Sequence, residues 1–277
     1  MRSRILSALV LLPVVVAAVI VGNPWWGALL AVVAVLATKE MVGIANAGGM
    51  RPDRWLAYVV ASALALTGLI PDIELVRPVL VIAVIGAYAA QIARAPAARS
   101  IHDWLATIAM PVAVGALTSY GVLIRGIDGG LAWTLLVLVM VWANDSAAYL
   151  AGRAFGHTPF FSSISPKKTL EGAAAGALAA MVVGLAAPSV GVLGPDALAP
   201  LAAQSPVALA TLGLAVSIVA PAGDLSQSFL KRQVGVKDSG QLIPGHGGVL
   251  DRIDSLLFAA PVAYYAALVL GGGWPGP

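Results

Sequence analysis

The chain of 277 residues is 60% hydrophobic and only 10% charged, and its mean hydropathy is +0.92. A soluble domain carries roughly 25% charged residues, so this composition excludes an ordinary soluble protein and predicts an integral membrane protein. The absence of cysteine excludes a disulfide framework and thiolate metal sites. The net charge of +3 reports membrane topology before anything else, and we expect no nucleic-acid partner.

Taken in chain order, apolar runs near the ~20 residues that a membrane-spanning helix needs recur along the sequence. They predict an all-α integral membrane protein, a polytopic helical bundle of about nine transmembrane helices with a polar site facing the cytoplasm. We expect one domain over 1–277, with N-terminal helices in 1–125 and the catalytic helices and cytoplasmic loops in 130–270. The first run follows a basic start, and we interpret it as a retained helix rather than a cleaved signal peptide. The predicted spans are 5–22, 25–45, 54–71, 76–93, 104–124, 130–152, 171–193, 205–225 and 250–270.

Basic residues are distributed unevenly between alternate loops. With the N-terminus in the cytoplasm, 14 of the 16 Lys and Arg residues fall on the cytoplasmic side, and only Arg77 and Arg125 fall on the other. This positive-inside bias predicts that the N-terminus and the polar segment 226–255 are cytoplasmic. The 14 cytoplasmic residues are Arg2, Arg4, Lys39, Arg51, Arg54, Arg94, Arg99, Arg153, Lys167, Lys168, Lys231, Arg232, Lys237 and Arg252.

Acidic residues mark the cytoplasmic ends of three predicted spans. Asp145 and Asp224 lie near the ends of the sixth and eighth spans, where an acid usually faces a polar cavity; a structural pair with a lysine is the alternative. Asp251 and Asp254 are spaced i, i+3 and would share one face at the start of the ninth span. Neighbouring carboxylates repel unless a cation lies between them, and hard oxygen ligands favour Mg²⁺. Asp224 is the natural third ligand.

Two lysines precede the predicted start of the seventh span, in the segment SISPKKTLEGAAAG over residues 163–176. We expect Thr169 to be the N-cap and Glu171 to lie in the first turn, so Lys167 and Lys168 would stand at a helix N-terminus. Exposed amides, the positive end of the helix dipole and two ammonium groups predict an anion site suited to phosphates. A plain positive-inside cluster is the alternative interpretation.

Glycines in two stretches suggest two different roles. Gly172 and Gly176 form a GxxxG pattern, for which we expect a helix packing face. In the sequence GHGG, Gly245, Gly247 and Gly248 let the backbone turn sharply and approach a ligand closely. His246 is a candidate metal ligand, or alternatively a residue that braces the loop or contacts phosphate.

A set of polar residues in the segment 226–255 carries a resemblance to a known family. In order they are Ser228, Lys231-Arg232, Lys237-Asp238, Gly240, Pro244, His246-Gly247-Gly248, Asp251-Arg252 and Asp254. In order and spacing they resemble the C-terminal signature of the phosphatidate cytidylyltransferases, also called CDP-diacylglycerol synthases. The stretches NDSAAYLAGRAFG and SPKKTLEG resemble two further segments of that family, so the resemblance reaches from about residue 142 to residue 255. Without the acids, the cations of this segment would only mark topology.

The resemblance implies an enzyme that joins CTP and phosphatidic acid to give CDP-diacylglycerol and pyrophosphate in phospholipid biosynthesis. It implies Mg²⁺, a monovalent cation such as K⁺, a homodimer, and a multi-pass location in the inner (plasma) membrane with a cytoplasmic active site. The phosphate of phosphatidate is already anionic, so it needs little help from a general base. Metal ions and lysines would instead relieve charge repulsion and place it in line with the α-phosphorus of CTP.

On this basis we assign roles to individual residues. The predicted catalytic residues are Asp224, Asp251, Asp254, Lys231 and Lys237, and the three aspartates are also the predicted metal ligands. The predicted substrate-binding residues are Asp145, Lys167, Lys168, Ser228, Arg232, Asp238, His246, Gly247, Gly248 and Arg252.

Two other classes of protein are compatible with parts of the pattern. A CTP-dependent polyprenol or phytol kinase would share the membrane body and the nucleotide site, but its acceptor hydroxyl should need a catalytic base, and the sequence offers no clear extra one. A transporter would place its site near the bilayer midplane, often on broken helices in related halves. Nearly every charge here lies toward one membrane face, and the sequence shows no internal repeat.

Overall fold

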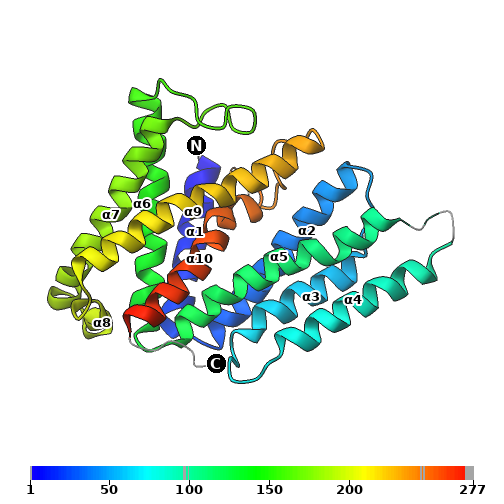
Figure 1. Cartoon of the computed structure of the whole chain (residues 1–277), viewed down its shortest axis with the longest axis horizontal. Helices are drawn as coiled ribbons and strands as arrows, with labels where there is room; N and C mark the ends of the chain where they lie inside the picture. Colours follow the sequence, from blue (N-terminus) through cyan, green and yellow to red (C-terminus); the bar gives the residue numbers. More distant parts are fainter. Residues whose placement is uncertain (1, 96–97, 99, 244, 246, 272–277) are drawn as a thin grey trace. The chain divides into compact units, whose positions relative to one another are not determined.

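Helices account for all regular secondary structure in the computed structural model, which describes residues 2–95, 98, 100–243, 245 and 247–271 apart from the side chains of 2–8 and 10. Within those residues the extended backbone pairs only in isolated bridges, such as Pro159 with Thr169. The predicted all-α class is confirmed (Figure 1). The α-helices are α1 (Arg2–Val21), α2 (Trp25–Ala47), α3 (Arg54–Thr67), α4 (Val76–Ala93), α5 (Ile101–Gly126), α6 (Gly130–Phe155), α7 (Leu170–Leu193), α8 (Ala199–Ala202), α9 (Pro206–Gln233) and α10 (Leu250–Leu270).

Each predicted span overlaps one long helix, and the largest difference in boundary is at the end of α9. The apolar run ends near residue 225, but α9 continues to Gln233, because its polar last turns are built from good helix formers such as leucine, lysine and arginine. Gly235 then ends the helix with a φ of 73°. The amide of Val236 donates to Lys231 O at 3.0 Å and that of Gly235 to Arg232 O at 3.2 Å, the two bonds of a Schellman cap. A third of the expected loop, residues 226–233, is therefore helical.

Seven of the described helices are long and apolar enough to cross a membrane: α2, α4, α5, α6, α7, α9 and α10. The predicted class of polytopic helical membrane protein is thus confirmed. The other two predicted spans are shorter. The helix α3 has 14 residues, a rise of about 21 Å against ~30 Å of hydrocarbon, and the described apolar part of α1 covers Leu11–Val21. Length and composition therefore show seven candidate spans among the described residues, and the predicted total of nine is not established by them.

The helices form two compact units, which we describe separately. The first contains Met1–Gly126 and Leu230–Ile253, and the second contains Ile127–Phe229 and Asp254–Pro277. The polar segment between residues 230 and 253 therefore packs with the N-terminal helices.

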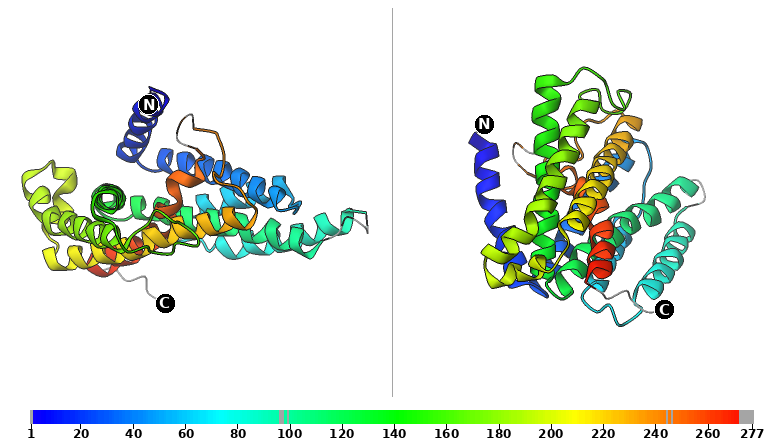
Figure 2. Two further views of the ribbon diagram at one scale, coloured as in Figure 1. Left: turned by 90° about the horizontal axis from the view of Figure 1, so that it is seen from above. Right: turned by 60° about the vertical axis from the view of Figure 1, so that its left-hand side comes forward.

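In the first unit, α3 lies between its neighbours, alongside α5, α2 and α4 (Figures 1 and 2). Val60 and Leu64 of α3 and Ala83 of α4 form a buried apolar cluster. The approach of α3 to α5 is close at Gly115, where an added Cβ would lie 2.6 Å from the carbonyl oxygen of Ala61. Dispersion between closely packed helices replaces the hydrophobic effect as the main attraction inside a membrane.

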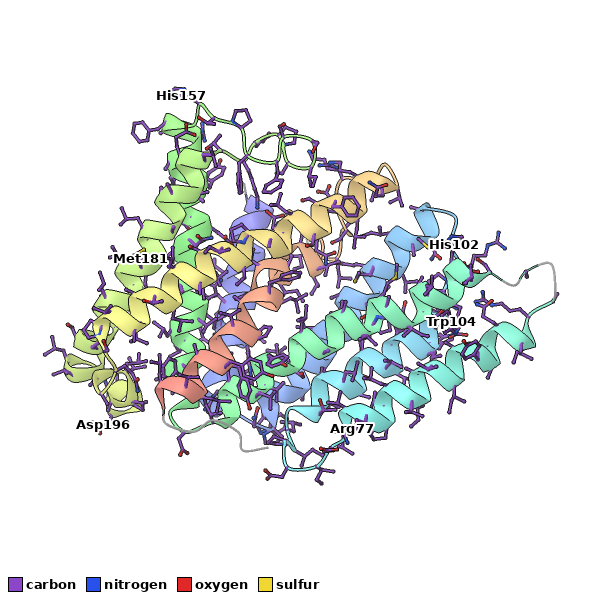
Figure 3. All side chains as sticks on the ribbon, viewed as in Figure 1. Arg77, His102, Trp104, His157, Met181 and Asp196 are labelled. Carbon is purple, nitrogen blue, oxygen red and sulfur yellow. The ribbon has the colours of Figure 1, made fainter. Side chains whose placement is uncertain are left out.

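In the second unit, small residues line the buried side of α7, which lies against α6 (Figure 1). An added Cβ at Gly172 would lie 2.7 Å from Ala148 O, and one at Gly176 would lie 2.7 Å from Asn144 Oδ1. The predicted packing role of this glycine pair is confirmed, because only glycine allows the two backbones to approach so closely. Figure 3 shows His157 and Asp196 at opposite ends of the α6–α7 pair.

Arg77 and Arg125, the two cations that do not follow the predicted positive-inside distribution, both have local partners in the first unit. Arg77, at the start of α4 and at the opposite end of these helices from His102 (Figure 3), pairs with Glu74 at 2.8 Å. Arg125, near the end of α5, donates from Nε to Val19 O at 2.7 Å, where α1 ends. Capping of helix carbonyls by a cation accounts for this second exception.

Candidate active site

The first unit holds a buried ion pair between the last turns of α9 and the first turn of α10. Lys231 Nζ lies 2.5 Å from Asp251 Oδ1, and the two side chains are only 7% and 10% exposed. Asp251 Oδ2 accepts from the backbone N–H groups of Ser239 at 3.1 Å and of Gly248 at 3.3 Å. Since α10 begins at Leu250, the predicted position of Asp251 in its first turn is confirmed. Both oxygens of this carboxylate are engaged, and they tie α9, the loop and α10 together.

A second buried carboxylate, that of Glu40 on α2, lies in the same cluster and was not predicted. It accepts hydrogen bonds from Ser239 Oγ at 2.9 Å, from Val249 N at 2.9 Å and from Leu250 N at 2.8 Å. An acid inside an apolar run is the signal that could have revealed Glu40. The same signal did single out Asp145 and Asp224, which lie in the other unit.

Glycines in the loop leave room for this carboxylate. A Cβ on Gly240 would lie 2.6 Å from Glu40 Oε1, and one on Gly248 would overlap both Glu40 Oε2 and Ser239 Oγ. Gly247 has a φ of 82°, which favours glycine. We predicted that the glycine backbone would approach a ligand closely. In the structure, Gly240 and Gly248 instead lie close to the carboxylate of Glu40. His246, predicted to bind substrate, lies outside the described residues.

Four further predicted site residues of this segment lie on its surface: Arg232, Lys237, Asp238 and Arg252. Arg232 donates from Nη1 to Val236 O at 3.0 Å, in the turn that ends α9. Their exposed charges can reach a ligand without breaking a buried contact. The structure thus separates the predicted residues of this segment into a buried ion pair and an accessible, mainly cationic rim.

The second unit holds a more open ion pair. Lys168 Nζ lies 2.8 Å from Asp224 Oδ2, with side-chain exposures of 25% and 37%. The same ammonium group lies 3.4 Å from Pro221 O, and Asp224 Oδ1 accepts from Ser228 Oγ at 3.3 Å. Asp224, Lys168 and Ser228 were all predicted site residues, and the structure brings them together. The alternative interpretation of Asp224, a structural ion pair with a lysine, is equally consistent with this contact.

The segment before α7 fixes the position of Lys168. Thr169 Oγ1 accepts from Gly172 N at 3.2 Å, so the predicted N-cap is confirmed. Phe160 N donates to Lys168 O at 2.8 Å, and Glu171, in the first turn as predicted, accepts from Thr158 Oγ1 at 2.8 Å. These bonds hold the backbone of Lys168 from both sides. Lys167, by contrast, is exposed.

Asp145 of α6 belongs to the same group of charges. It is exposed, accepts a hydrogen bond from Asn144 Nδ2 at 3.0 Å, and interacts electrostatically with Lys168 and Asp224. One ammonium group thus lies among two accessible carboxylates. Such a group of charges can exchange its internal contacts for a cation or a phosphate at modest cost, because water still solvates it.

Asp254 lies one turn beyond the start of α10 and is buried in the second unit. Its Oδ1 accepts from Ser255 N at 2.7 Å. Gly223, the residue before Asp224, packs against the backbone carbonyl of Asp254 so closely that a Cβ there would overlap it. The chain positions of Asp224 and Asp254 are therefore adjacent where α9 meets α10 in this unit.

Carboxylates that could hold Mg²⁺ occur in both units, as pairs with a lysine. Within either unit, the described residues include no group of three or more His, Asp or Glu side chains placed to hold a metal ion. Mg²⁺ commonly keeps several waters and takes one or two carboxylates together with substrate phosphates, so it does not require such a cage. The accessible oxygens of Asp224 fit this kind of site. Those of Asp251 are already engaged by Lys231 and two amides.

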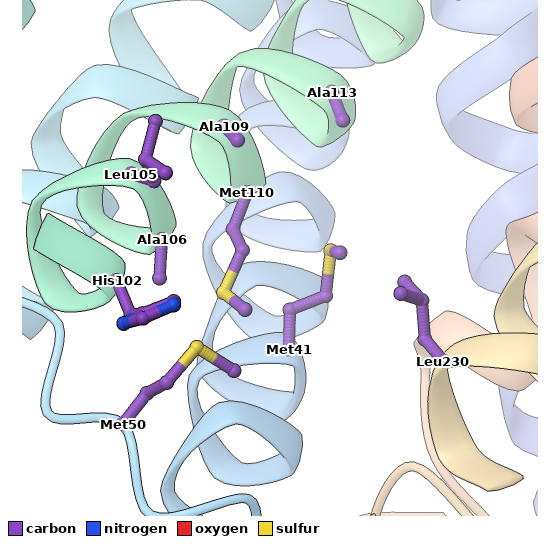
Figure 4. A pocket seen from close by; sticks show the side chains of 9 residues that line it. All are labelled: Met41, Met50, His102, Leu105, Ala106, Ala109, Met110, Ala113 and Leu230. Carbon is purple, nitrogen blue, oxygen red and sulfur yellow. The ribbon is translucent and has the colours of Figure 1, made fainter. Parts of the chain in front are cut away.

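An apolar pocket of about 420 Å³ lies in the first unit (Figure 4). Three methionines and the ring of His102 surround its near end, and Leu230 lies opposite them. Its lining is Met41, Met50, His102, Leu105, Ala106, Ala109, Met110, Ala113 and Leu230. Apart from the ring of His102, this lining offers no polar side chain for a triphosphate, and a charge needs hydrogen bonds or counter-charges when it leaves water. This pocket therefore does not fit the nucleotide that the family resemblance implies.

Known proteins resemble this chain over most of its length in one comparison and over about half of it in another. The sequence profile described as the Cytidylyltransferase family matches residues 2–270. A phosphatidate cytidylyltransferase of Synechocystis is 46% identical over 144 residues, 51% of this chain and 45% of that protein. The phosphatidate cytidylyltransferase of Bacillus subtilis is 38% identical over 156 residues, 55% of this chain and 54% of that protein. The one of Brucella suis is 44% identical over 144 residues, 51% of this chain and 49% of that protein. The matched region is about half the length of these curated relatives.

Proposed function

This chain belongs to the cytidylyltransferase family, and from that premise we propose that it is a phosphatidate cytidylyltransferase. In the proposed reaction, a phosphate oxygen of phosphatidic acid forms a bond to the α-phosphorus of CTP. The bond from that phosphorus to the bridging oxygen breaks, and pyrophosphate leaves with the electron pair. The products are CDP-diacylglycerol, a precursor in phospholipid biosynthesis, and pyrophosphate. The names of the similar proteins from three bacteria support this assignment.

The observation that carries the proposal is the accessible pair of Lys168 and Asp224, with Asp145 beside it. Two polyanionic substrates repel each other, so the transfer needs positive charge held in a fixed position more than it needs a base. Lys168 offers such a charge because its backbone is fixed on both sides. In the first unit, the exposed cations Lys237 and Arg232 are further groups that we propose as phosphate contacts.

We propose Mg²⁺ as the cofactor, with K⁺ as an additional monovalent cation. Of the predicted ligands Asp224, Asp251 and Asp254, the accessible Asp224 is best placed to accept a cation. Mg²⁺ supplies neutralisation of phosphate charge when bound. This chain's own residues would position the phosphates and keep the acids oriented. Loss of turnover in excess EDTA and its recovery with added Mg²⁺ would test the requirement.

We propose that the protein lies in the inner (plasma) membrane of the cell and crosses it nine times. The N-terminus and the segment 226–255 would both face the cytoplasm. The charge distribution supports α3 as a crossing, because otherwise Arg51 and Arg94, before and after α3 and α4, could not both lie on the positively charged side with the N-terminus. The chain has no cysteine, so Gln233→Cys creates a single reporter. We expect an impermeant maleimide to label Gln233→Cys only after cells are opened. Labelling in intact cells would contradict this orientation.

A direct assay tests the proposed activity. Purified protein with CTP, phosphatidic acid and Mg²⁺ should form CDP-diacylglycerol and an equal amount of pyrophosphate. Phytol or dolichol in place of phosphatidic acid should give no product. Phosphorylation of either alcohol without CDP-diacylglycerol formation would instead identify a lipid kinase. The same preparation, sized by light scattering in detergent, tests the homodimer that the family resemblance implies.

A further inference from the structure

The carboxylate of Glu40 occupies the N-terminus of α10 from a helix far away in the sequence. Glu40 is 7% exposed, so it is almost wholly removed from water. Its two closest backbone partners, Val249 and Leu250, lie 209 and 210 residues further along the chain. Its third partner, the hydroxyl of Ser239, comes from the loop that precedes α10. All of these residues belong to the first unit.

The start of α10 lacks a cap of its own, which explains why an acid is needed there. The first amides of a helix have no partner within the helix, and a serine, threonine, aspartate or asparagine usually supplies one. Here the residue before α10 is Val249, whose side chain has no oxygen. Glu40 accepts from Val249 N and Leu250 N, while Asp251 accepts from Gly248 N. Three successive amides are therefore satisfied by two carboxylates.

This arrangement also changes the meaning of the glycine-rich turn before α10. A glycine-rich turn that leads into a helix N-terminus commonly binds phosphate through its free amides. In this chain the amides of Gly248, Val249 and Leu250 are engaged, and a carboxylate already complements the helix dipole. A phosphate could bind the amides of Val249 and Leu250 only by displacing the buried Glu40 side chain.

We propose that Glu40 is a positioning residue for Asp251 and Lys231, two of the predicted catalytic residues, within the first unit. By capping α10 and fastening Ser239, it holds Asp251 in the place where Lys231 pairs with it, and it keeps substrate phosphates away from the α10 N-terminus. The proposal rests on the proposed cytidylyltransferase activity for its kinetic consequences. Its structural content, a carboxylate that holds the 239–250 backbone, does not depend on which reaction the enzyme performs.

The first test compares Glu40→Gln with Glu40→Ala. Glutamine keeps the volume, but its amide group cannot accept from all three donors, so we expect kcat to fall about 10-fold, as for other residues that orient a ligand. Alanine removes the cap completely and lets the loop shift, for which we expect a loss of about 100-fold in kcat. KM for CTP and for phosphatidic acid should change less than about 2-fold. Glu40→Gln with parental kcat, or failing to fold, would overturn the positioning role.

The second test is chemical rescue with formate. Glu40→Ala leaves a space of the size of a small carboxylate beside the two amides that Glu40 accepted from. Formate can replace the cap there, so we expect it to raise the kcat of Glu40→Ala by about 10-fold or more. A residue needed only to fill the core would not be rescued in this way. Glu74→Ala, an exposed acid of the same unit, and the parent protein serve as controls and should not respond to formate. No response in Glu40→Ala would count against the proposal.

The third measurement separates this inference from the proposed function. Backbone hydrogen exchange over residues 248–250 should be faster in both Glu40 variants, and formate should slow it again in Glu40→Ala. This readout needs no substrate, so it holds even for a parent protein that fails to use CTP and phosphatidic acid. Unchanged exchange in both variants would show that Glu40 does not hold these amides.

Discussion

The two lysine–aspartate pairs of this chain differ in how far water reaches them. Lys231 and Asp251 are almost wholly buried, and the aspartate also accepts from two backbone amides. Lys168 and Asp224 are partly exposed, and their additional contacts are weaker, at 3.3 Å and 3.4 Å. The same two residue types thus form a rigid support in one unit and an accessible group of charges in the other. Charge alone, as read from sequence, does not distinguish these roles.

The largest effect is expected when the buried pair is broken. Asp251→Ala would leave the ammonium group of Lys231 buried without its partner, which typically costs about 3–5 kcal/mol of stability. We therefore expect both a lower Tm in detergent and loss of turnover. The double variant Lys231→Met with Asp251→Ala should recover most of the Tm but none of the activity. A parental Tm in Asp251→Ala would show that the pair is not a support.

The accessible pair should behave in the opposite way. Lys168→Ala should reduce transition-state stabilisation by about 2–4 kcal/mol, by analogy with the loss of one preorganised donor, while Tm changes little. Lys168→Arg should also lose activity, because the geometry of the contact changes although the charge remains. Lys167→Ala is the matched control, because Lys167 is the neighbour of Lys168 in the chain and its side chain is exposed. Equal losses at the two positions would favour a simple topology signal over a phosphate contact.

A third ion pair sharpens the comparison because its acid is buried, its cation is half-buried, and both residues are far from the predicted site residues in sequence. Arg94 Nη1 donates to Asp103 Oδ2 at 3.0 Å, and Asp103 also accepts from Arg51 N. Arg94→Ala would leave the buried Asp103 carboxylate with one fewer donor, so we expect about 1–3 kcal/mol of destabilisation. Turnover measured well below the Tm should stay within about 2-fold of the parent. A large loss of turnover at parental Tm would place Arg94 in the active site.

The smallest effect is expected for the most exposed ion pair, that of Arg77 and Glu74. Arg77 and Glu74 are paired at 2.8 Å, but their side chains are 81% and 73% exposed. Exposed pairs commonly contribute nothing measurable to stability, because water competes for both charges. Arg77→Ala should therefore leave Tm and turnover unchanged within error. A clear loss at this position would mean that exposure is a poor guide to role in this protein.

Much of the fold followed from local sequence rules. Apolar length located the long helices, and the threonine before α7 predicted its cap, because both signals act over a few residues. The true end of α9 did not follow, since hydropathy reports where a helix meets water rather than where it stops. Gly235 was the better signal there.

The candidate site was harder to predict, because burial and partners depend on distant segments. Sequence reasoning named Asp224 and Lys168, and the structure pairs them. It also named Asp251, but could not show that this acid is enclosed by Lys231 and two amides. Glu40 was overlooked since it lies in the N-terminal half, outside the segments that carry the resemblance. Only folding brings it to the polar loop.

The long separation between Glu40 and its partners has a consequence for the biosynthesis of the protein. Ribosomes add about 5–20 residues each second, and Val249 follows Glu40 by 209 residues, so Glu40 is made about 10–40 s before its last partners. During that interval an acid lies in an apolar segment without the amides that later satisfy it. A nascent or truncated chain that ends before residue 239 would keep this unsatisfied carboxylate, a feature by which membrane quality control could recognise and degrade it.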